Sequence, residues 1–235
     1  MIGFENEKDE FILTYIRDGM NHLKNKEYLE AYKLFILASE IYKKKMNDDN
    51  TIEYYKQQYI TYLNMSASMY LCQYKLDEIK NEQYLEDSIQ YLIECIELCK
   101  NDKVNFDIHY LNNLLCETYF IKNDFISIEK FHLDNILHVK KMYGDNNAIE
   151  YAKIYSSQYF NKTIGMEDIN IIASYSRISL LLLIEVYKIN SDPNILGYFF
   201  DEKILKDANF NETEINEIME LRKMDEKVTE ITMNL

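Results

Sequence analysis

Side chains that could do chemistry are scattered through this sequence. Cys95 and Cys99 stand four residues apart, so one face of a helix would carry both thiols. A structural zinc site needs two further Cys or His ligands, and none stands at a matching spacing nearby. His132 and His138 stand six residues apart, on different faces of a helix, and so do not form a pair. We therefore expect no metal site, and we expect both cysteines to be small buried core residues.

Sequence motifs of catalysis are also missing. The chain contains no HExxH helix, Walker loop or GxSxG elbow, and its five glycines leave little loop to cradle a phosphate. Residues 145–147, Asp-Asn-Asn, begin like a calcium loop but lack the later Gly and Glu of that motif. We expect no cofactor and no enzymatic activity. The remaining alternative is an enzyme that uses a pair of its many carboxylates.

The charge of the chain restricts its partners. It has 40 Asp and Glu against 26 Lys and Arg, a net charge of −14. Binding a polyanion requires a basic face, so we expect no nucleic acid partner. The charge fits either a basic protein partner or a solvated acidic surface. The lysine clusters at 43–45 and 140–141 fit helix C-termini, where cations oppose the negative end of the helix dipole.

No segment predicts secretion or membrane insertion. Residues 1–10 carry acids and lack the apolar stretch of a signal peptide. The longest apolar run, residues 180–184, is too short to span a bilayer. The four cysteines lack the spacing of a disulfide framework and fit a reducing compartment. We expect no membrane span and a cytoplasmic location, with the nucleus as the alternative.

The composition and the hydrophobic pattern both predict helices. Five Gly and one Pro are too few for the turns of a β protein, and 47% hydrophobic residues are enough for a real core. The pattern predicts helices at 8–23, 27–46, 51–73, 84–99, 106–121, 125–143, 147–160 and 167–189. The last of these is apolar on nearly every face, so we expect it to be buried on several sides.

Small residues in 15–42 stand where two helices would approach closely. Gly19 lies on the first predicted helix, and Ala31 and Ala38 lie on the second, with Phe35 one turn from each alanine. This stretch resembles one tetratricopeptide repeat (TPR), with Tyr15 in place of the usual tryptophan. One such helix pair cannot bury its apolar face alone, so further pairs are expected to stack on it.

Residues 60–98 resemble a second repeat. Its small and large positions are Asn64, Ala67, Ser68 and Tyr70 on the first helix, then Ser88, Leu92 and Cys95 on the second. A third pair is weaker, because His132 and Asn135 fit poorly where an aromatic residue and an alanine are expected. The TPR family implies an all-α, right-handed superhelix, here of about four helix pairs with a C-terminal capping helix.

We predict two domains, a TPR-like repeat domain at 1–190 and a C-terminal helical extension at 191–235. The boundary is Asp192-Pro193, because Pro starts helices but rarely continues one. Beyond it an apolar stripe at helical spacing comprises Ile215, Ile218, Leu221, Met224, Val228 and Ile231. This extension either caps the open end of the repeats, docks on a partner, or folds back into the protein's own groove.

In the TPR family the first helix of each pair lines a concave surface. Co-chaperones of the family carry a carboxylate clamp there, at positions that correspond to Ile16, Met20, Asn64, Tyr110 and Leu114 of this chain. Only Asn64 is retained, and without cations an acidic peptide tail would lose water and gain no charge partner. We therefore predict that this is not a carboxylate-clamp protein.

We predict instead an apolar groove that binds a partner. Its residues are Leu13, Ile16, Met20, Leu23, Leu63, Asn64, Ala67, Tyr70, Tyr110, Asn113 and Phe120. The groove would hold an amphipathic helix or hydrophobic segment of another protein, so the chain would act as an adaptor or scaffold in a hetero-complex. Two alternatives remain: a shifted register in which these residues belong to the core, and a structural subunit that uses its outer faces.

Overall fold

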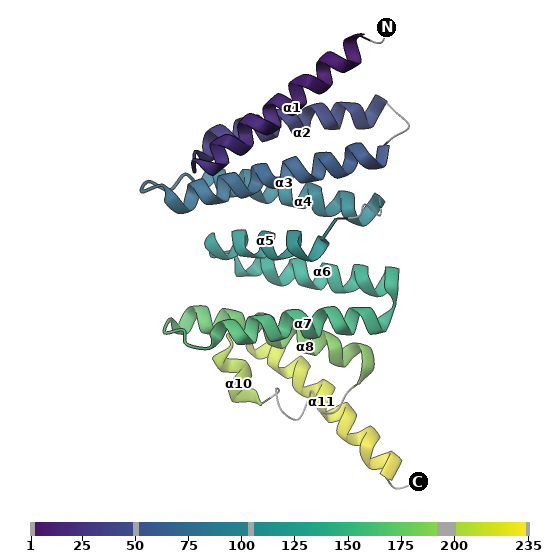
Figure 1. Cartoon of the computed structure of the whole chain (residues 1–235). Helices are drawn as coiled ribbons and strands as arrows, with labels where there is room; N and C mark the ends of the chain where they lie inside the picture. The colour runs from purple at the N-terminus through teal and green to yellow at the C-terminus, as the bar shows by residue number, and fades with distance from the viewer. Residues whose placement is uncertain (1–2, 49–51, 103–105, 192–200, 234–235) are drawn as a thin grey trace. The chain divides into compact units, whose positions relative to one another are not determined.

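A computed structural model describes residues 3–48, 52–102, 106–191 and 201–233. Within these ranges there is no strand, which confirms the all-α prediction. The helices are, in chain order (Figure 1), α1 (Gly3–Lys24), α2 (Tyr28–Asp48), α3 (Ile52–Leu76), α4 (Glu82–Asp102), α5 (Ile108–Ile121), α6 (Phe125–Tyr143), α7 (Asp145–Thr163), α8 (Ile169–Asn190), α10 (Glu202–Asp207) and α11 (Glu212–Met233). The predicted boundary at Asp192-Pro193 lies outside the described residues.

The chain divides into two compact units, Met1–Asp124 and Phe125–Leu235. The first unit contains α1 to α5, and the second contains α6, α7, α8, α10 and α11. The division falls between the two helices that the sequence assigns to a third repeat, and not at residue 190. The proposed domains 1–190 and 191–235, and the superhelical path of the repeats, stay predictions.

Residues in the left-handed conformation end several helices. Lys26, Asn123 and Asn209 have φ values of 61°, 57° and 61° and follow α1, α5 and α10. After α1, the amide of Glu27 donates to the carbonyl of His22 and the amide of Lys26 donates to that of Leu23. This pair of bonds satisfies the last carbonyls of the helix and reverses the chain in a short turn. Ser191 ends α8 in the same conformation, with a φ of 51°. Asparagine tolerates the conformation well, so two of these four helix ends have a local sequence cause.

In the first unit each helix packs on the next one in sequence, from α1 through α5. Ala31, Phe35 and Met69 form a buried cluster between α2 and α3, which we call the first core cluster. Gly19 of α1 lies against it: a Cβ at that position would be 2.7 Å from Cε1 of Phe35. The close approach of α1 and α2 that the small residues predict is therefore confirmed.

The second predicted small-residue pattern is also buried. Ser88, Leu92 and Cys95 of α4 are completely buried. The hydroxyl of Ser88 donates to the carbonyl of Ala67 at 2.9 Å, so the backbones of α3 and α4 lie close together. Further along, Leu71, Tyr74 and Leu85 form a second cluster that joins α3 and α4 and contacts Leu114 and Ile121 of α5.

In the second unit α6, α7 and α8 pack on one another around a buried histidine. Nδ1 of His132 lies 2.9 Å from the hydroxyl of Tyr151, and Nε2 lies 2.8 Å from that of Tyr159. A neutral imidazole has one N–H, so one tyrosine donates to the ring and the other accepts from it. Burial, with a smaller contribution from Lys162, lowers the pKa of His132 to about 3. The residue that fits the repeat pattern poorly is thus a satisfied core histidine.

α8 is buried on two opposite sides, as its all-round apolar character predicts. On one side Tyr175 packs on Tyr159 of α7, and the Ser179 hydroxyl lies 2.9 Å from that of Ser156. The opposite side is also buried, with Ala173, Leu180 and Ile184 at helical spacing on either side of Arg177. Residues 201–223, which we call the C-terminal segment, contact Arg177 and bury apolar side chains of their own, Leu205, Ala208, Phe210, Ile215 and Ile218. We conclude that the C-terminal segment is bound to this second side at Arg177, where α6 also contacts α8 through Glu129.

Among the described residues, α8 is the one helix long and apolar enough to cross a membrane by length and composition. It is more extensive than the apolar run at 180–184 suggests, and 44% of its most apolar window is buried within the protein. A core helix buried on two sides meets the same criterion, so the length and composition of α8 alone do not assign it to a membrane.

Candidate partner-binding surface

α1 carries more apolar surface than α2 covers. Ile12 and Gly19 face α2 and are buried. Leu13 and Met20, about a quarter-turn around the helix from them, are 65% and 38% exposed, and Ile16 lies half-buried on the same side. Toward its N-terminus α1 diverges from α2 (Figure 1). The structure therefore leaves a continuous apolar stripe on α1 without a partner from the described part of the first unit.

Leu23 is the last residue of this stripe, at its C-terminal end. It is half-buried and packs against the first core cluster, as Met65 of α3 also does. We call Leu13, Ile16, Met20 and Leu23 the α1 surface. All four belong to the predicted groove, and the structure brings them together on one side of one helix.

The predicted groove residues of α3 do not lie on an open surface. Ala67 is completely buried, and its carbonyl faces Ser88 of α4. Leu63 is also buried, and so is Asn64, whose side-chain Oδ1 has no hydrogen-bond partner among the described atoms. These three residues belong to the core, because α3 packs against both α2 and α4. For this helix the burial agrees with the alternative in which these residues belong to the core.

Tyr70 of α3 lies between the second helices of the two pairs. Its ring stacks on Tyr32 of α2 with centroids 3.8 Å apart and on Tyr84 of α4 with centroids 4.8 Å apart. The hydroxyl of Tyr32 in turn lies 3.0 Å from that of Tyr91. Tyr70 therefore joins α2, α3 and α4, on the side of α3 that faces the second helices rather than in the groove.

The open side of α3 is mostly polar, and it continues onto α5. Ser68 and Cys72 are half-exposed, and the ammonium of Lys75 lies 2.6 Å from a carboxylate oxygen of Glu117 on α5. The predicted groove did not include Ser68 and Cys72, which stand one and two positions after the predicted residues Ala67 and Tyr70. The apolar character of the groove is thus concentrated on α1.

The predicted groove residues of α5 differ in their exposure. Tyr110 and Asn113 are exposed, and Phe120 is half-buried. Asp107 caps the N-terminus of α5, where its side chain accepts hydrogen bonds from the amides of His109 and Tyr110. Nothing on α5 extends Tyr110 into an apolar stripe like that of α1.

Within the described residues, no three His, Cys, Asp or Glu side chains are grouped so that they could hold a metal. Cys95 and Cys99 are buried free thiols. Burial raises the pKa of the Cys95 thiol above its ordinary range and that of Cys99 to about 11. A buried thiol with a raised pKa is a poor nucleophile, which fits the prediction that both are core residues.

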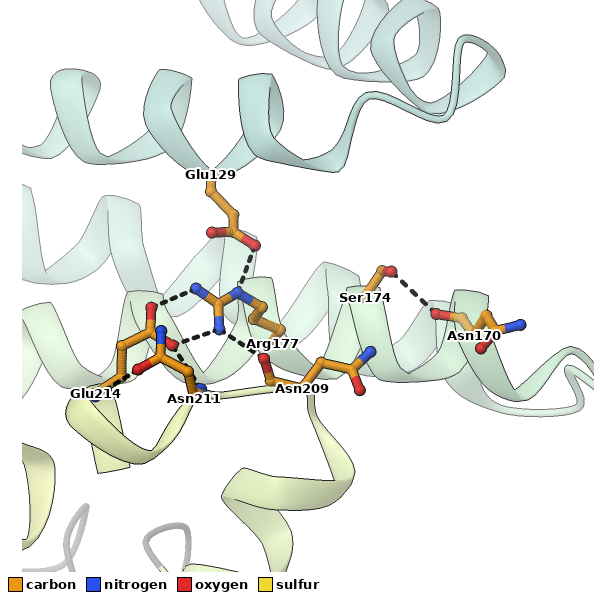
Figure 2. A network of polar contacts seen from close by, with 7 residues as sticks. All are labelled: Glu129, Asn170, Ser174, Arg177, Asn209, Asn211 and Glu214. Carbon is orange, nitrogen blue, oxygen red and sulfur yellow. Dashed lines mark hydrogen bonds and ion pairs between the residues drawn. The ribbon is translucent and has the colours of Figure 1, made fainter. Parts of the chain in front are cut away.

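A network of charged side chains holds the C-terminal segment in the second unit (Figure 2). The guanidinium of Arg177 on α8 donates from Nε to Glu129 of α6 at 2.8 Å. It donates from Nη2 and Nη1 to the two carboxylate oxygens of Glu214 on α11, at 2.7 and 3.0 Å. Nη1 also donates to the carbonyl of Asn209, and the guanidinium carbon lies 4.5 Å from the centre of the Phe210 ring. One arginine thus joins α6, α8 and α11.

The two glutamates of this network differ in their surroundings. Burial raises the pKa of Glu129 despite its bond to Arg177. The bidentate bond from Arg177 lowers the pKa of Glu214, which also accepts a hydrogen bond from the amide of Asn211. Asn211 caps α11 in return, because its side chain accepts from the amide of Glu214. These contacts fix the C-terminal segment to α8, so we assign them a structural role.

Comparisons with known proteins identify no family for this chain. No family model matches it, and no curated protein matches it. One similar solved structure is the crystal structure of BtubC (BKLC) from P. vanneervenii, at 10% identity and a TM-score of 0.40, covering 92% of this chain and 78% of that chain.

Proposed function

We propose that this chain is a non-enzymatic protein-interaction module, whose α1 surface binds a helix or another apolar segment of a partner protein. The observation that carries the proposal is the exposure of Leu13 and Met20 beside Ile16 on a helix whose other side is packed on α2. An apolar side chain left in water costs free energy, and a contiguous row of them is typical of an interface.

The resemblance to TPR proteins belongs to the same proposal. It rests on the buried small residues Gly19, Ala31 and Ala38 and on the two helix pairs α1–α2 and α3–α4. In such repeats the first helices carry the binding surface, and α1 is the first helix of its pair. A cytoplasmic adaptor or scaffold that prefers a partner with basic groups would fit the net charge of −14.

A second function has an observation of its own. Leu37 on α2 and Ile93 on α4 are 41% and 37% exposed, and both lie on the second helices of their pairs. A subunit of a larger assembly that uses its outer faces would use residues such as these.

Paired variants distinguish the two functions. The full chain is isolated from native cells with its partners, and the partner is identified by mass spectrometry and then made recombinantly. The proposal expects L13D/M20D to weaken binding of that partner by at least about a hundredfold, because two carboxylates would be buried without a counter-charge. L37D/I93D, with the same change in charge, should bind like the wild type. The reverse pattern would establish the outer faces as the interface and overturn the α1 proposal.

A further inference from the structure

The spacing of the α1 surface is that of a seam between two helices. Leu13, Ile16, Met20 and Leu23 are separated by three, four and three residues. Apolar residues at this alternating spacing form a narrow stripe that a single partner helix fills, since they correspond to the a and d positions of a coiled-coil heptad. The stripe extends over residues 13–23 of α1, which correspond to about 16 Å, or three helical turns, of such a pairing.

The charge of α1 is unevenly distributed along the helix. The N-terminal half of its sequence contains four acids, Glu5, Glu7, Asp9 and Glu10, against one lysine, Lys8. The C-terminal half contains Arg17 and Lys24 against Asp18, and Asp18 lies 3.2 Å from Arg17 in an exposed pair of its own. The sequence of the N-terminal half therefore has three more acids than bases, and that of the C-terminal half has one more base than acids, which leaves Lys24 as its unneutralised charge.

A helix with this charge distribution is complementary to itself when two copies run antiparallel. The acidic half of one copy then lies beside the basic half of the other, whereas a parallel arrangement would place acids beside acids. Glu10 and Lys24 are both exposed and stand 14 residues apart, that is, two heptads, on the same edge of the seam. In coiled coils the positions that flank the seam choose the partner and its direction.

We infer that the helix bound on the α1 surface is α1 of a second copy of this chain, in antiparallel orientation. The inference rests on the proposed function of the α1 surface and names its partner. Leu13 of one copy lies opposite Leu23 of the other, Ile16 lies opposite Met20, and Glu10 lies near Lys24. The contact is isologous and closes at two copies. Since one helix pair buries less area than a standard interface, the dimer is a reversible one.

The experiment measures the mass of the full chain by analytical ultracentrifugation from about 1 to about 300 µM. We expect a monomer–dimer equilibrium within this range, and we expect L13D/M20D to remain monomeric throughout. The matched control is T14D/N21D, which adds the same two charges to α1 on the side away from the seam. It should dimerise like the wild type, with all variants checked for helix content and thermal stability by circular dichroism.

Charge reversal tests the orientation. E10K and K24E should each weaken the dimer by about tenfold, because each places like charges together at both ends of the seam. The double variant E10K/K24E should restore the wild-type association. A parallel dimer would show no such rescue, and that result would overturn the inference.

The other outcomes separate this inference from the proposed function. If the wild type stays monomeric at the highest concentration while L13D/M20D loses a different protein partner, the second copy is excluded and the proposed function stands. If the chain dimerises and L13D/M20D dimerises equally well, the inference is wrong, because another surface makes the dimer. If L13D/M20D changes neither self-association nor partner binding, both proposals are wrong.

Discussion

Gly19 of α1 and Phe35 of α2 touch so closely that a Cβ at position 19 would lie 2.7 Å from the ring. The Phe35 side chain is completely buried in the first core cluster. Because a side chain at position 19 would meet this ring, glycine permits the close packing of α1 on α2. Leu13 and Met20 lie about a quarter-turn around α1 from the side of this contact and are exposed.

Replacement of Gly19 by valine should destabilise the first unit by about 2 kcal/mol or more. Valine regains a little helix propensity over glycine, but its branched side chain overlaps the ring of Phe35. Urea unfolding followed by circular dichroism measures the change. Asn21→Val, at an exposed position of the same helix, is the control and should shift the free energy of unfolding by less than about 0.5 kcal/mol. Equal effects of the two variants would contradict the close contact.

Replacement by aspartate should strongly destabilise the protein at one residue of α3 and have little effect at the next residue. Ala67 is completely buried against α4, so Ala67→Asp should cost about 3 kcal/mol or more and should be recovered in unfolded or aggregated form. Ser68 is half-exposed, so Ser68→Asp should fold and melt within a few degrees of the wild type. Thermal melts of both variants test the register of α3. Similar melting temperatures would show that the register is wrong.

Loss of Arg177 should release the C-terminal segment. The side chain is 19% exposed, and its removal leaves Glu129 largely buried without its cation. We expect Arg177→Met to cost about 2 kcal/mol and to speed proteolysis within residues 201–223. The control Lys188→Met removes an exposed ion pair with Glu185 on the same helix and should cost less than about 0.5 kcal/mol. Unchanged proteolysis in Arg177→Met would show that the apolar contacts hold the segment alone.

His132 should make the stability of the second unit depend on pH below neutrality. Its pKa is about 3 in the folded protein because of burial, against about 6.5 in an unfolded chain. The unfolded state therefore binds a proton that the folded state does not between these values. The stabilisation is complete above pH 6.5 and is lost as the pH falls toward 3, by up to about 1.4 kcal/mol per pH unit.

The measurement is urea unfolding of the wild type and of His132→Phe at pH 7.5, 6.5, 5.5 and 4.5. Other groups titrate equally in both proteins, so the difference between them isolates the histidine. The phenylalanine variant loses the hydrogen bonds to Tyr151 and Tyr159 and should be less stable at pH 7.5. Its disadvantage should shrink as the pH falls. A constant difference across the series would exclude the histidine as the cause.

Local patterns predicted the helices well. The predicted helix 125–143 coincides with α6, and the other seven predicted helices begin and end within five residues of the observed limits. The small residues Gly19, Ala31 and Ala38 predicted the close packing of α1 and α2 because their size acts directly at the contact. These features depend on residues that are close together in the chain, so they can be predicted from the sequence.

Contacts between distant residues could not be predicted in the same way. α3 is buried on more than one side, so its apolar periodicity does not single out one face, and the assignment of Leu63 and Ala67 to the groove was wrong. Arg177 contacts glutamates 48 and 37 residues away, and no local pattern connects them. One signal was readable: Asn211 followed three residues later by Glu214 is a capping box, which marks the start of α11.

The position of the C-terminal segment has a consequence for biosynthesis. α8 leaves the ribosome before residues 201–223 are made, and until they arrive Arg177 lacks its contacts with Glu214, Asn209 and Phe210. A nascent or prematurely terminated chain would therefore expose this arginine more than the finished chain does, with only Glu129 as its partner among the residues of this network.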